Sequence, residues 1–362
     1  MALAPRSGVM QIDAYVPGRS DAAGAARVYK LSSNESPFGP SPKAIAAYES
    51  AERSLGVYPE GTSRILRDAI AAHYGLAADR IVCGNGSDEI LHLIANAYLR
   101  PNDEVLFGAH AFNLYKIATL SNSAVPIEIP EPELKMEVDH VLERATARTR
   151  LVYVANPNNP TGSYVSAPDM RRLRAGLPND ALLVIDAAYA EYVKRNDYEA
   201  GIELVSTSDN VVMTRTFSKV YGLAGIRIGW AYCPKGVAEV LNRVRAPFNV
   251  NIAAQRAAAA ALADSAFVER ARNHNETWCT WLIEQIRAMG LRVDDSVANF
   301  VLIHFPQTPG RSSTDADRFL MERGVILRGC ASYGLPQCLR LTVGSEEANK
   351  AAVDALRAFV AS

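Results

Sequence analysis

The chain has 362 residues, of which 49% are apolar and 21% charged, and its formal net charge is -1. This length predicts two domains of unequal size, and the composition is that of a globular enzyme. The small net charge argues against nucleic acid or a membrane as partner. The five cysteines are scattered, which predicts a reducing cytoplasmic location and no disulfide framework. The six histidines are scattered as well, which predicts no metal site.

The first part of the chain reads as an arm followed by helices. Residues 1–30 look irregular and lack the apolar core of a signal peptide. A polar loop covers residues 31–37, and Pro42 opens a helix that extends through residues 44–53. Thr62 or Ser63 is expected to cap an amphipathic helix over residues 65–74. No apolar run approaches the roughly 18 residues of a membrane span.

From residue 80, short apolar strands alternate with loops and helices. Strands are expected at 81–83, 104–107, 151–154, 182–185, 210–214 and 226–231, with helices at 89–98 and 114–120. Continuous apolar strands in this alternation predict an α/β fold whose largely parallel sheet is covered on both faces. Ligands of such sheets bind outside the carboxyl ends of the strands.

After residue 251 the pattern changes. An alanine-rich region, 253–289, is expected to be helical up to Gly290. Short strands then follow at 291–293, 300–305, 325–328 and 339–343, with helices at 316–323 and 346–360, which predicts a smaller α+β domain. The expected division is an arm at 1–40 that contributes to the small domain and the substrate site, a large cofactor-binding domain at 41–251, and a small domain at 252–362.

Polar groups are expected to converge at the strand ends. The segment Gly84-Asn85-Gly86-Ser87-Asp88 lies between a strand and a helix, where free N–H groups favour a phosphate. A plain tight turn is the alternative, and the segment matches neither the Walker nor the dinucleotide pattern. The segment from Asn156 to Gly162 is a proline-bounded loop that displays asparagine amides at a strand end.

Four further side chains complete this set. Asp186 follows an apolar strand, so its buried carboxylate calls for a cation, and Tyr189 lies three residues later. Lys219 lies just past a strand end, and Arg227 offers a cationic fork suited to phosphate. A phosphate cradle, a carboxylate, an asparagine, a tyrosine and a lysine are what pyridoxal 5'-phosphate requires, since proteins bind it as a lysine Schiff base.

The order of these motifs resembles that of the histidinol-phosphate aminotransferase family, which are fold-type I pyridoxal-phosphate aminotransferases. The resemblance runs from about Leu31 to the C-terminus. It rests on SNESPFGPSP, YPEGTSRILRDAIA, GNGSDEIL, NPNNPTG, DAAYAEY, TFSKVYGLAGIRIGW, SVANF, GVILRG and LRLTVG. It implies a large domain with a mainly parallel, seven-stranded sheet covered by helices, and a smaller α+β domain.

The resemblance also implies roles for the cofactor site. Lys219 matches the Schiff-base lysine and proton shuttle, Asp186 the partner of the pyridinium nitrogen, and Asn159 and Tyr189 the partners of the phenolic oxygen. Phe112 matches the ring that stacks on the cofactor, where many relatives have tyrosine. The positions that match the phosphate-binding segments are Gly86, Ser87, Asp88, Thr216, Ser218 and Arg227.

Substrate and partner residues are implied in the same way. Tyr58 matches a tyrosine that reaches the neighbouring subunit's cofactor, which implies an obligatory homodimer. Arg340 and Arg328 match cations that hold the anionic end of the substrate, and two arginines suit a dianionic phosphate. Tyr15 and Asn34 belong to arm segments that cover the substrate.

The implied reaction is a ping-pong transamination of L-histidinol phosphate with 2-oxoglutarate. It gives imidazole acetol phosphate and L-glutamate, a step of histidine biosynthesis. An aromatic aminotransferase acting on phenylalanine or tyrosine is the alternative, because the same arginines can bind a carboxylate. A decarboxylase of the same fold and a non-catalytic cofactor-bearing regulator are further alternatives, the last disfavoured by the complete polar set.

Overall fold

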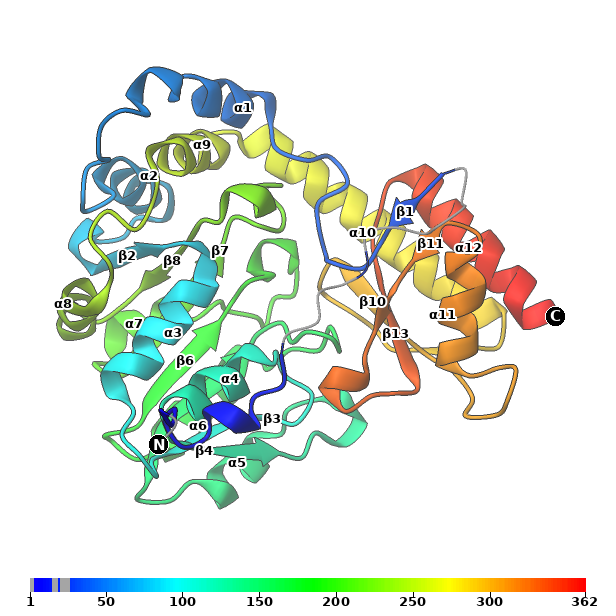
Figure 1. Ribbon diagram of the computed structural model, residues 1–362, viewed down its shortest axis with the longest axis horizontal. Coiled ribbons are helices and arrows are strands. Elements are labelled where there is room, and N and C mark those ends of the chain that lie inside the picture. Colours follow the sequence, from blue (N-terminus) through cyan, green and yellow to red (C-terminus); the bar gives the residue numbers. More distant parts are fainter. Residues whose placement is uncertain (1–2, 15–18, 20–26) are drawn as a thin grey trace.

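The computed structural model describes residues 3–14, 19 and 27–362. Its centre is a seven-stranded sheet in the order β2-β8-β7-β6-β5-β3-β4 (Figure 1). Strand β8 runs antiparallel to β7 and β2, and the other neighbouring pairs are parallel. The predicted mainly parallel sheet is therefore confirmed. The strands are β2 (Ile81–Gly84), β3 (Glu104–Gly108), β4 (Val125–Ile129), β5 (Thr149–Ala155), β6 (Leu182–Asp186), β7 (Val211–Thr216) and β8 (Gly229–Tyr232).

Helices cover both faces of this sheet, because alternate strand residues enter two separate apolar clusters. Leu151 and Tyr153 of β5 pack with α3 (Gly86–Tyr98), α4 (Leu114–Ser121) and α8 (Lys235–Val244). Val152 and Val154 belong to the cluster on the opposite face. The helices of that cluster are α1 (Pro42–Glu49), α2 (Arg64–Tyr74), α5 (Val138–Arg144), α6 (Ala167–Gly176), α7 (Ile202–Thr207), α9 (Ile252–Leu262) and the first turns of α10, at Val268 and Ala271.

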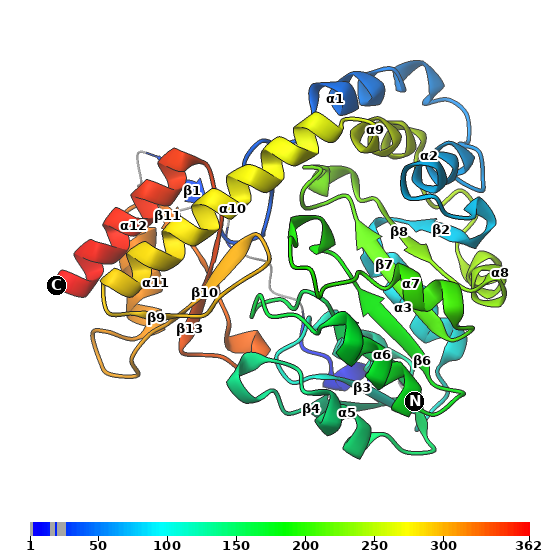
Figure 2. The same cartoon turned by 180° about the vertical axis from the view of Figure 1, so that it is seen from behind.

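A smaller body packs beside the large sheet. Its antiparallel sheet has the order β12-β13-β10-β9, formed by β9 (Arg292–Val293), β10 (Phe300–His304), β12 (Arg328–Gly329) and β13 (Cys338–Thr342). From the arm, β1 (Tyr29–Lys30) pairs in parallel with β11 (Val325–Ile326). The helices α10 (Ser265–Ala288), α11 (Ser313–Met321) and α12 (Glu346–Ala361) share the apolar cluster of this body. Helix α10 runs diagonally from α9 into the small body (Figure 2).

The expected continuous helix over 253–289 is wrong, because α9 ends at Leu262 and α10 begins at Ser265. The break coincides with Asp264, whose backbone is not helical and whose carboxylate pairs with Lys43 of α1 at 3.3 Å. Helix α9 packs in the large core, whereas α10 turns toward the small body. Residues 252–262 thus pack with the large sheet, and the division into domains stays a prediction.

Two local expectations are corrected as well. Ser63 has a left-handed backbone and its side chain makes no cap to α2; the Glu60 carboxylate instead accepts from the backbone N–H of Thr62 (3.1 Å) and Arg64 (2.8 Å). The strand expected at 226–231 begins only at Gly229, because Arg227 has φ 50° and follows a 3-10 turn. No helix in the described ranges is long and apolar enough to cross a membrane.

Candidate active site

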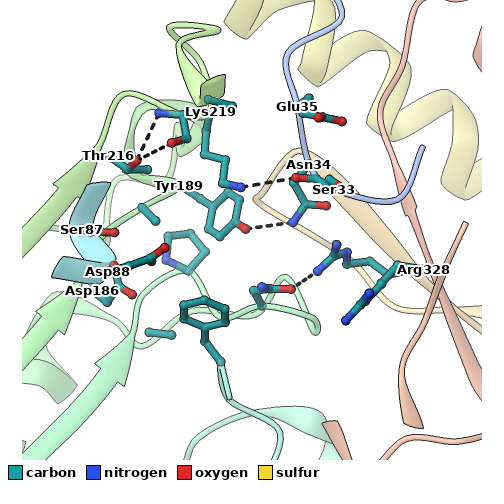
Figure 3. Close-up of a pocket in the computed structure, with 18 of the residues that line it drawn as sticks. Ser33, Asn34, Glu35, Ser87, Asp88, Asp186, Tyr189, Thr216, Lys219 and Arg328 are labelled. Atoms are coloured by element: carbon teal, nitrogen blue, oxygen red, sulfur yellow. Dashed lines mark hydrogen bonds between the residues drawn. The ribbon is translucent and has the colours of Figure 1, made fainter. Parts of the chain in front are cut away.

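A cavity of about 260 Å³ lies at the carboxyl ends of β5, β6 and β7, where the large sheet meets the arm and the small body. Figure 3 shows Asp186, Tyr189, Thr216 and Lys219 on one side, with Ser33, Asn34 and Arg328 on the other. The structure therefore brings together side chains that are more than 300 positions apart in the sequence. The predicted residues that line the cavity are Asn34, Ser87, Asp88, Phe112, Asn159, Asp186, Tyr189, Thr216, Ser218, Lys219, Arg227, Arg328 and Arg340.

Lys219 lies three residues after the end of β7 and points into this cavity (Figure 3). Its Nζ lies 3.5 Å from the carbonyl oxygen of Ser33 and 5.5 Å from the centre of the Tyr189 ring. Burial, with a further contribution from the Arg340 charge, lowers the pKa of Lys219 to about 8. A nucleophilic or basic amine is therefore accessible close to neutral pH.

Asp186 is the last residue of β6 and is 6% exposed. The hydroxyl of Tyr115 donates to one carboxylate oxygen at 2.9 Å, and that of Thr214 donates to the other at 3.1 Å. Burial raises the pKa of Asp186 to about 6, and these hydrogen bonds act in the opposite direction. Tyr115 is not among the residues predicted from the sequence, because nothing in its local pattern distinguishes it from an ordinary helical core residue.

Tyr189 is held by the arm. The Asn34 amide donates to the Tyr189 hydroxyl at 2.8 Å (Figure 3). Asn34 is in turn fixed by the hydroxyl of Thr342 at 3.1 Å and by Asn299, whose amide donates to the Asn34 carbonyl at 3.0 Å. Burial raises the pKa of Tyr189 to about 12, so its hydroxyl keeps its proton at neutral pH.

The N-terminus of α3 forms the anion-binding end of the cavity. The helix begins at Gly86, so Ser87 lies in the first turn, where backbone N–H groups are unpaired by the helix. The guanidinium of Arg227 lies against this turn: a Cβ placed on Gly86 would approach Arg227 Nη2 to 2.5 Å. Arg227 also donates to the Ser218 hydroxyl at 3.2 Å and pairs with Asp88 at 3.1 Å. Thr216 donates to the same Ser218 hydroxyl at 3.0 Å.

Arginines of β12 and β13 form the opposite end. Arg340 is 4% exposed; it donates to the Asn159 side-chain oxygen and, at 2.7 Å, to the Ser32 carbonyl. Its Nε atom has no hydrogen-bond partner among the described residues. Arg328 lies directly opposite Arg340 in the β12–β13 pairing, so both side chains are on one face of the sheet.

The remaining predicted residues are placed as follows. Phe112 lines the cavity and meets Tyr115 edge to face, with ring centres 6.0 Å apart. Tyr58 lies outside this chain's cavity and stacks on Phe248 at 4.6 Å. Tyr15 lies outside the described residues. Tyr333, which the sequence analysis also missed, lines the cavity from the turn after β12.

Comparison with known proteins gives consistent matches. The family model described as aminotransferase class I and II matches residues 26–356. The histidinol-phosphate aminotransferase of Rhodopseudomonas palustris (strain BisB5) is 53% identical over 358 residues, covering 99% of this chain and 98% of that protein. The protein of the same name from Nitrobacter winogradskyi is 52% identical, with the same coverage.

Among solved structures, the histidinol-phosphate aminotransferase from Sinorhizobium meliloti in complex with pyridoxal-5'-phosphate superposes with a TM-score of 0.85. That chain is 26% identical, and the match covers 92% of each chain. The predicted fold class is confirmed by this match and by the sheet order.

Proposed function

The chain belongs to the aminotransferase class I and II family, and from this premise we propose that it transfers the amino group of L-histidinol phosphate to 2-oxoglutarate. The observation that carries the proposal is the cavity itself. It has a half-buried lysine and a buried carboxylate on the sheet side and two arginines on the small-body side. The relatives that are 52% and 53% identical bear the name of this activity.

The residues present fit pyridoxal 5'-phosphate. The first turn of α3, with Ser87, Thr216, Ser218 and Arg227, offers hydroxyls, N–H groups and a cation to a phosphate. Asp186 is the carboxylate for the ring nitrogen, and Asn159 and Tyr189 are the donors for the phenolic oxygen. Because Gly86 has no side chain, the Arg227 guanidinium can lie against the first turn of α3, where a Cβ would collide with it. Phe112 offers an apolar ring on the cavity wall.

When bound, the cofactor supplies an electron sink for the charge that develops at the substrate's α-carbon. Lys219 is the residue that would hold it covalently, and the Lys219 amine would move the α-proton of the substrate. The pKa of about 8 leaves part of the Lys219 population unprotonated near pH 7. Asp186 supplies a negative charge at a position that is only 6% exposed, where a preorganised charge counts for more than in solution.

Substrate choice is assigned to Arg328 and Arg340. Like charges that face each other directly across two strands repel. A dianionic phosphate placed between them offsets this repulsion better than a single carboxylate does. Arg340 Nε, buried and unpartnered within the described part of the chain, is an available donor. This arrangement favours the phosphate substrate over an aromatic amino acid.

We also propose a homodimer in which Tyr58 reaches the neighbouring site. Tyr58 is 81% exposed although it stacks on Phe248. Leu55, Val57 and Ile65, from the same loop and the start of α2, are exposed as well. Exposed apolar residues gathered in one segment are typical of an interaction surface. A cytoplasmic location is proposed because all five cysteines are free and buried.

Steady-state kinetics test the substrate. We expect kcat/KM for histidinol phosphate, with 2-oxoglutarate as acceptor, to exceed that for phenylalanine and for tyrosine. A wide margin in favour of phenylalanine would overturn the assignment, and release of carbon dioxide would identify a decarboxylase instead.

Hybrid dimers test the shared site. A Tyr58→Phe chain mixed with excess Lys219→Ala chain forms dimers in which one site has both Lys219 and Tyr58. We expect activity per Tyr58→Phe chain to rise in the mixture. Unchanged activity per chain, with subunit exchange verified, would show that each protomer is self-contained.

A further inference from the structure

A buried ion pair lies behind the cavity, on the other side of β7. Arg215 Nη1 lies 3.2 Å from Glu191 Oε1, and both side chains are 8% exposed. Neither residue is among those that line the cavity. The reaction proposed above uses neither group directly, so the cost of burying two charges there calls for another explanation.

The two partners belong to the segments that carry the reacting groups. Arg215 lies between Thr214, which bonds Asp186, and Thr216 at the anion-binding end. Since successive residues of a strand point to opposite faces, Arg215 points away from the cavity while its neighbours point toward it. Glu191 follows Tyr189 by two residues, in the 3-10 turn Ala190–Tyr192.

Two tyrosines extend the pair toward Lys219. Arg215 Nη1 donates to the Tyr74 hydroxyl at 2.9 Å, and its guanidinium lies 4.9 Å from the centre of the Tyr74 ring. The Tyr74 hydroxyl is 3.2 Å from that of Tyr221, two residues beyond Lys219. One connected set of contacts therefore reaches the segments of Tyr189, Thr216 and Lys219 from behind.

We propose that Arg215 and Glu191 are positioning residues. Through contacts on the side of β7 that faces away from the cavity, they fix the positions of Tyr189 and Lys219 relative to β7. This inference rests on the proposed function, because it assigns the pair to the orientation of the cofactor-binding groups. An ion pair suits this task better than apolar packing, since its hydrogen bonds have fixed directions and apolar contacts do not. Small displacements of reacting groups are costly in rate.

A double-mutant cycle tests the proposal, with Arg215→Met, Glu191→Gln and the double variant. Each single variant leaves one buried polar group without its partner, so we expect a lower melting temperature. The double variant removes both charges and should regain most of that loss. If the pair positions the site, however, two defects should remain in the double variant. The pH midpoint of the cofactor's visible absorbance should differ from that of the wild type, and kcat should be about 10-fold lower. KM for 2-oxoglutarate should change less than kcat.

A double variant with wild-type melting temperature, absorbance midpoint and kcat would overturn the proposal and leave the pair a structural feature alone. Arg174→Met is the matched control, because Arg174 is also a buried arginine but, among the described residues, it donates to the backbone carbonyls of Leu177, Pro178 and Ala181 and pairs with no carboxylate. It should lower the melting temperature without moving the midpoint.

Tyr74→Phe keeps the proposal testable if the charge variants do not fold. It removes only the hydroxyl that joins Arg215 to Tyr221, and we expect the midpoint to move in the direction seen for Glu191→Gln. An unmoved midpoint in both would overturn the proposal. Wild-type protein that binds no cofactor would instead contradict the proposed function, so the two failures are distinguishable.

Discussion

The two sides of the cavity are built differently. On the sheet side, Asp186, Thr216 and Lys219 lie at or just past the ends of adjacent parallel strands, and their surroundings belong to the two apolar clusters that cover the large sheet. On the other side, Asn34 comes from the arm, and Arg328 and Arg340 come from a pair of antiparallel strands. Hydrogen bonds that join the two sides include Asn34 to Tyr189 and Arg340 to Asn159.

This difference separates two tasks. Groups held by a shared sheet keep a constant geometry, as cofactor chemistry requires. Groups on a smaller body can change their distance from the sheet side when different substrates bind, and closure of such elements is a common catalytic step. We therefore expect sheet-side variants to affect all substrates alike, and small-body variants to change substrate preference.

The largest effect is expected on the sheet side, for Lys219→Ala. Loss of the covalent attachment and of the proton-transferring amine should lower kcat by about 10⁴-fold or more, for every substrate. Borohydride should fix the cofactor to the wild-type peptide that contains Lys219 and leave the variant unlabelled. Lys350→Ala is the control, because Lys350 lies away from the cavity, where its amine pairs with Glu346 and lies 6.0 Å from the centre of the Trp278 ring. Labelling of the Lys219→Ala protein would contradict the assignment.

The next largest effect is expected across the cavity, for Arg340→Ala. We expect kcat/KM for histidinol phosphate to fall about 100-fold, since hydrogen bonds to charged groups are the strong ones. The loss for phenylalanine should be clearly smaller, and the protein should stay yellow because the sheet side is intact. Arg323→Ala on the surface is the control. An unchanged ratio of the two kcat/KM values would count against this division of tasks.

A smaller, substrate-independent effect is expected for Tyr115→Phe. Its hydroxyl donates to Asp186 and helps to keep that carboxylate charged. Without it the pKa of Asp186 rises, so the acid limb of the kcat profile should move upward by about 1 pH unit, with kcat lowered about 2-fold at pH 7 and about 10-fold at pH 5.

Tyr153→Phe is the matched control for this change. Tyr153 stacks on Tyr115 at 4.7 Å, but its own hydroxyl donates to the Leu91 carbonyl. An acid limb that moves equally in both variants would show that Tyr115 acts through packing alone.

The smallest effect is a gain in stability of the cofactor-free protein. The pKa of Asp186 is raised from 3.8 to about 6, so the cost of its buried charge is fully present above pH 6 and absent below about pH 4. The pKa of Lys219 is lowered from 10.5 to about 8, so its cost is fully present below pH 8 and absent above about pH 10.5. Each cost is about 3 kcal/mol at pH 7.

Asp186→Asn and Lys219→Met should therefore each raise the melting temperature at pH 7, by about 5 °C. The gain for Asp186→Asn should disappear toward pH 4, and calorimetry across pH measures this. Asp354→Asn, in an exposed pair with Arg357, should show no such pH-dependent gain. A gain that does not depend on pH would mean that packing, not charge burial, is responsible.

Much of this organisation could be predicted from the chain alone. The apolar strands that end in Asp186 or lead to Lys219 predict both the parallel sheet and the edge of the sheet at which ligands bind. Helix ends were less predictable. The cap of α2 is Glu60 and not the expected Ser63. Ser63 has a left-handed backbone, and its side chain makes no capping hydrogen bond. The alanine-rich region divides at Asp264, because α9 packs in the large core whereas α10 leaves that core after its first turns and continues into the small body.

The sequence by itself determined the kinds of chemical groups and the edge of the sheet at which they gather, since periodicity and strand ends are local properties. Only the tertiary structure decided their partners. It placed Tyr115 on Asp186, Asn34 on Tyr189 and Arg215 on Glu191. These contacts set the pKa values and the orientation of the reacting groups. The physical reason is that hydrogen bonds and desolvation depend on distances between elements, which packing of the whole chain establishes.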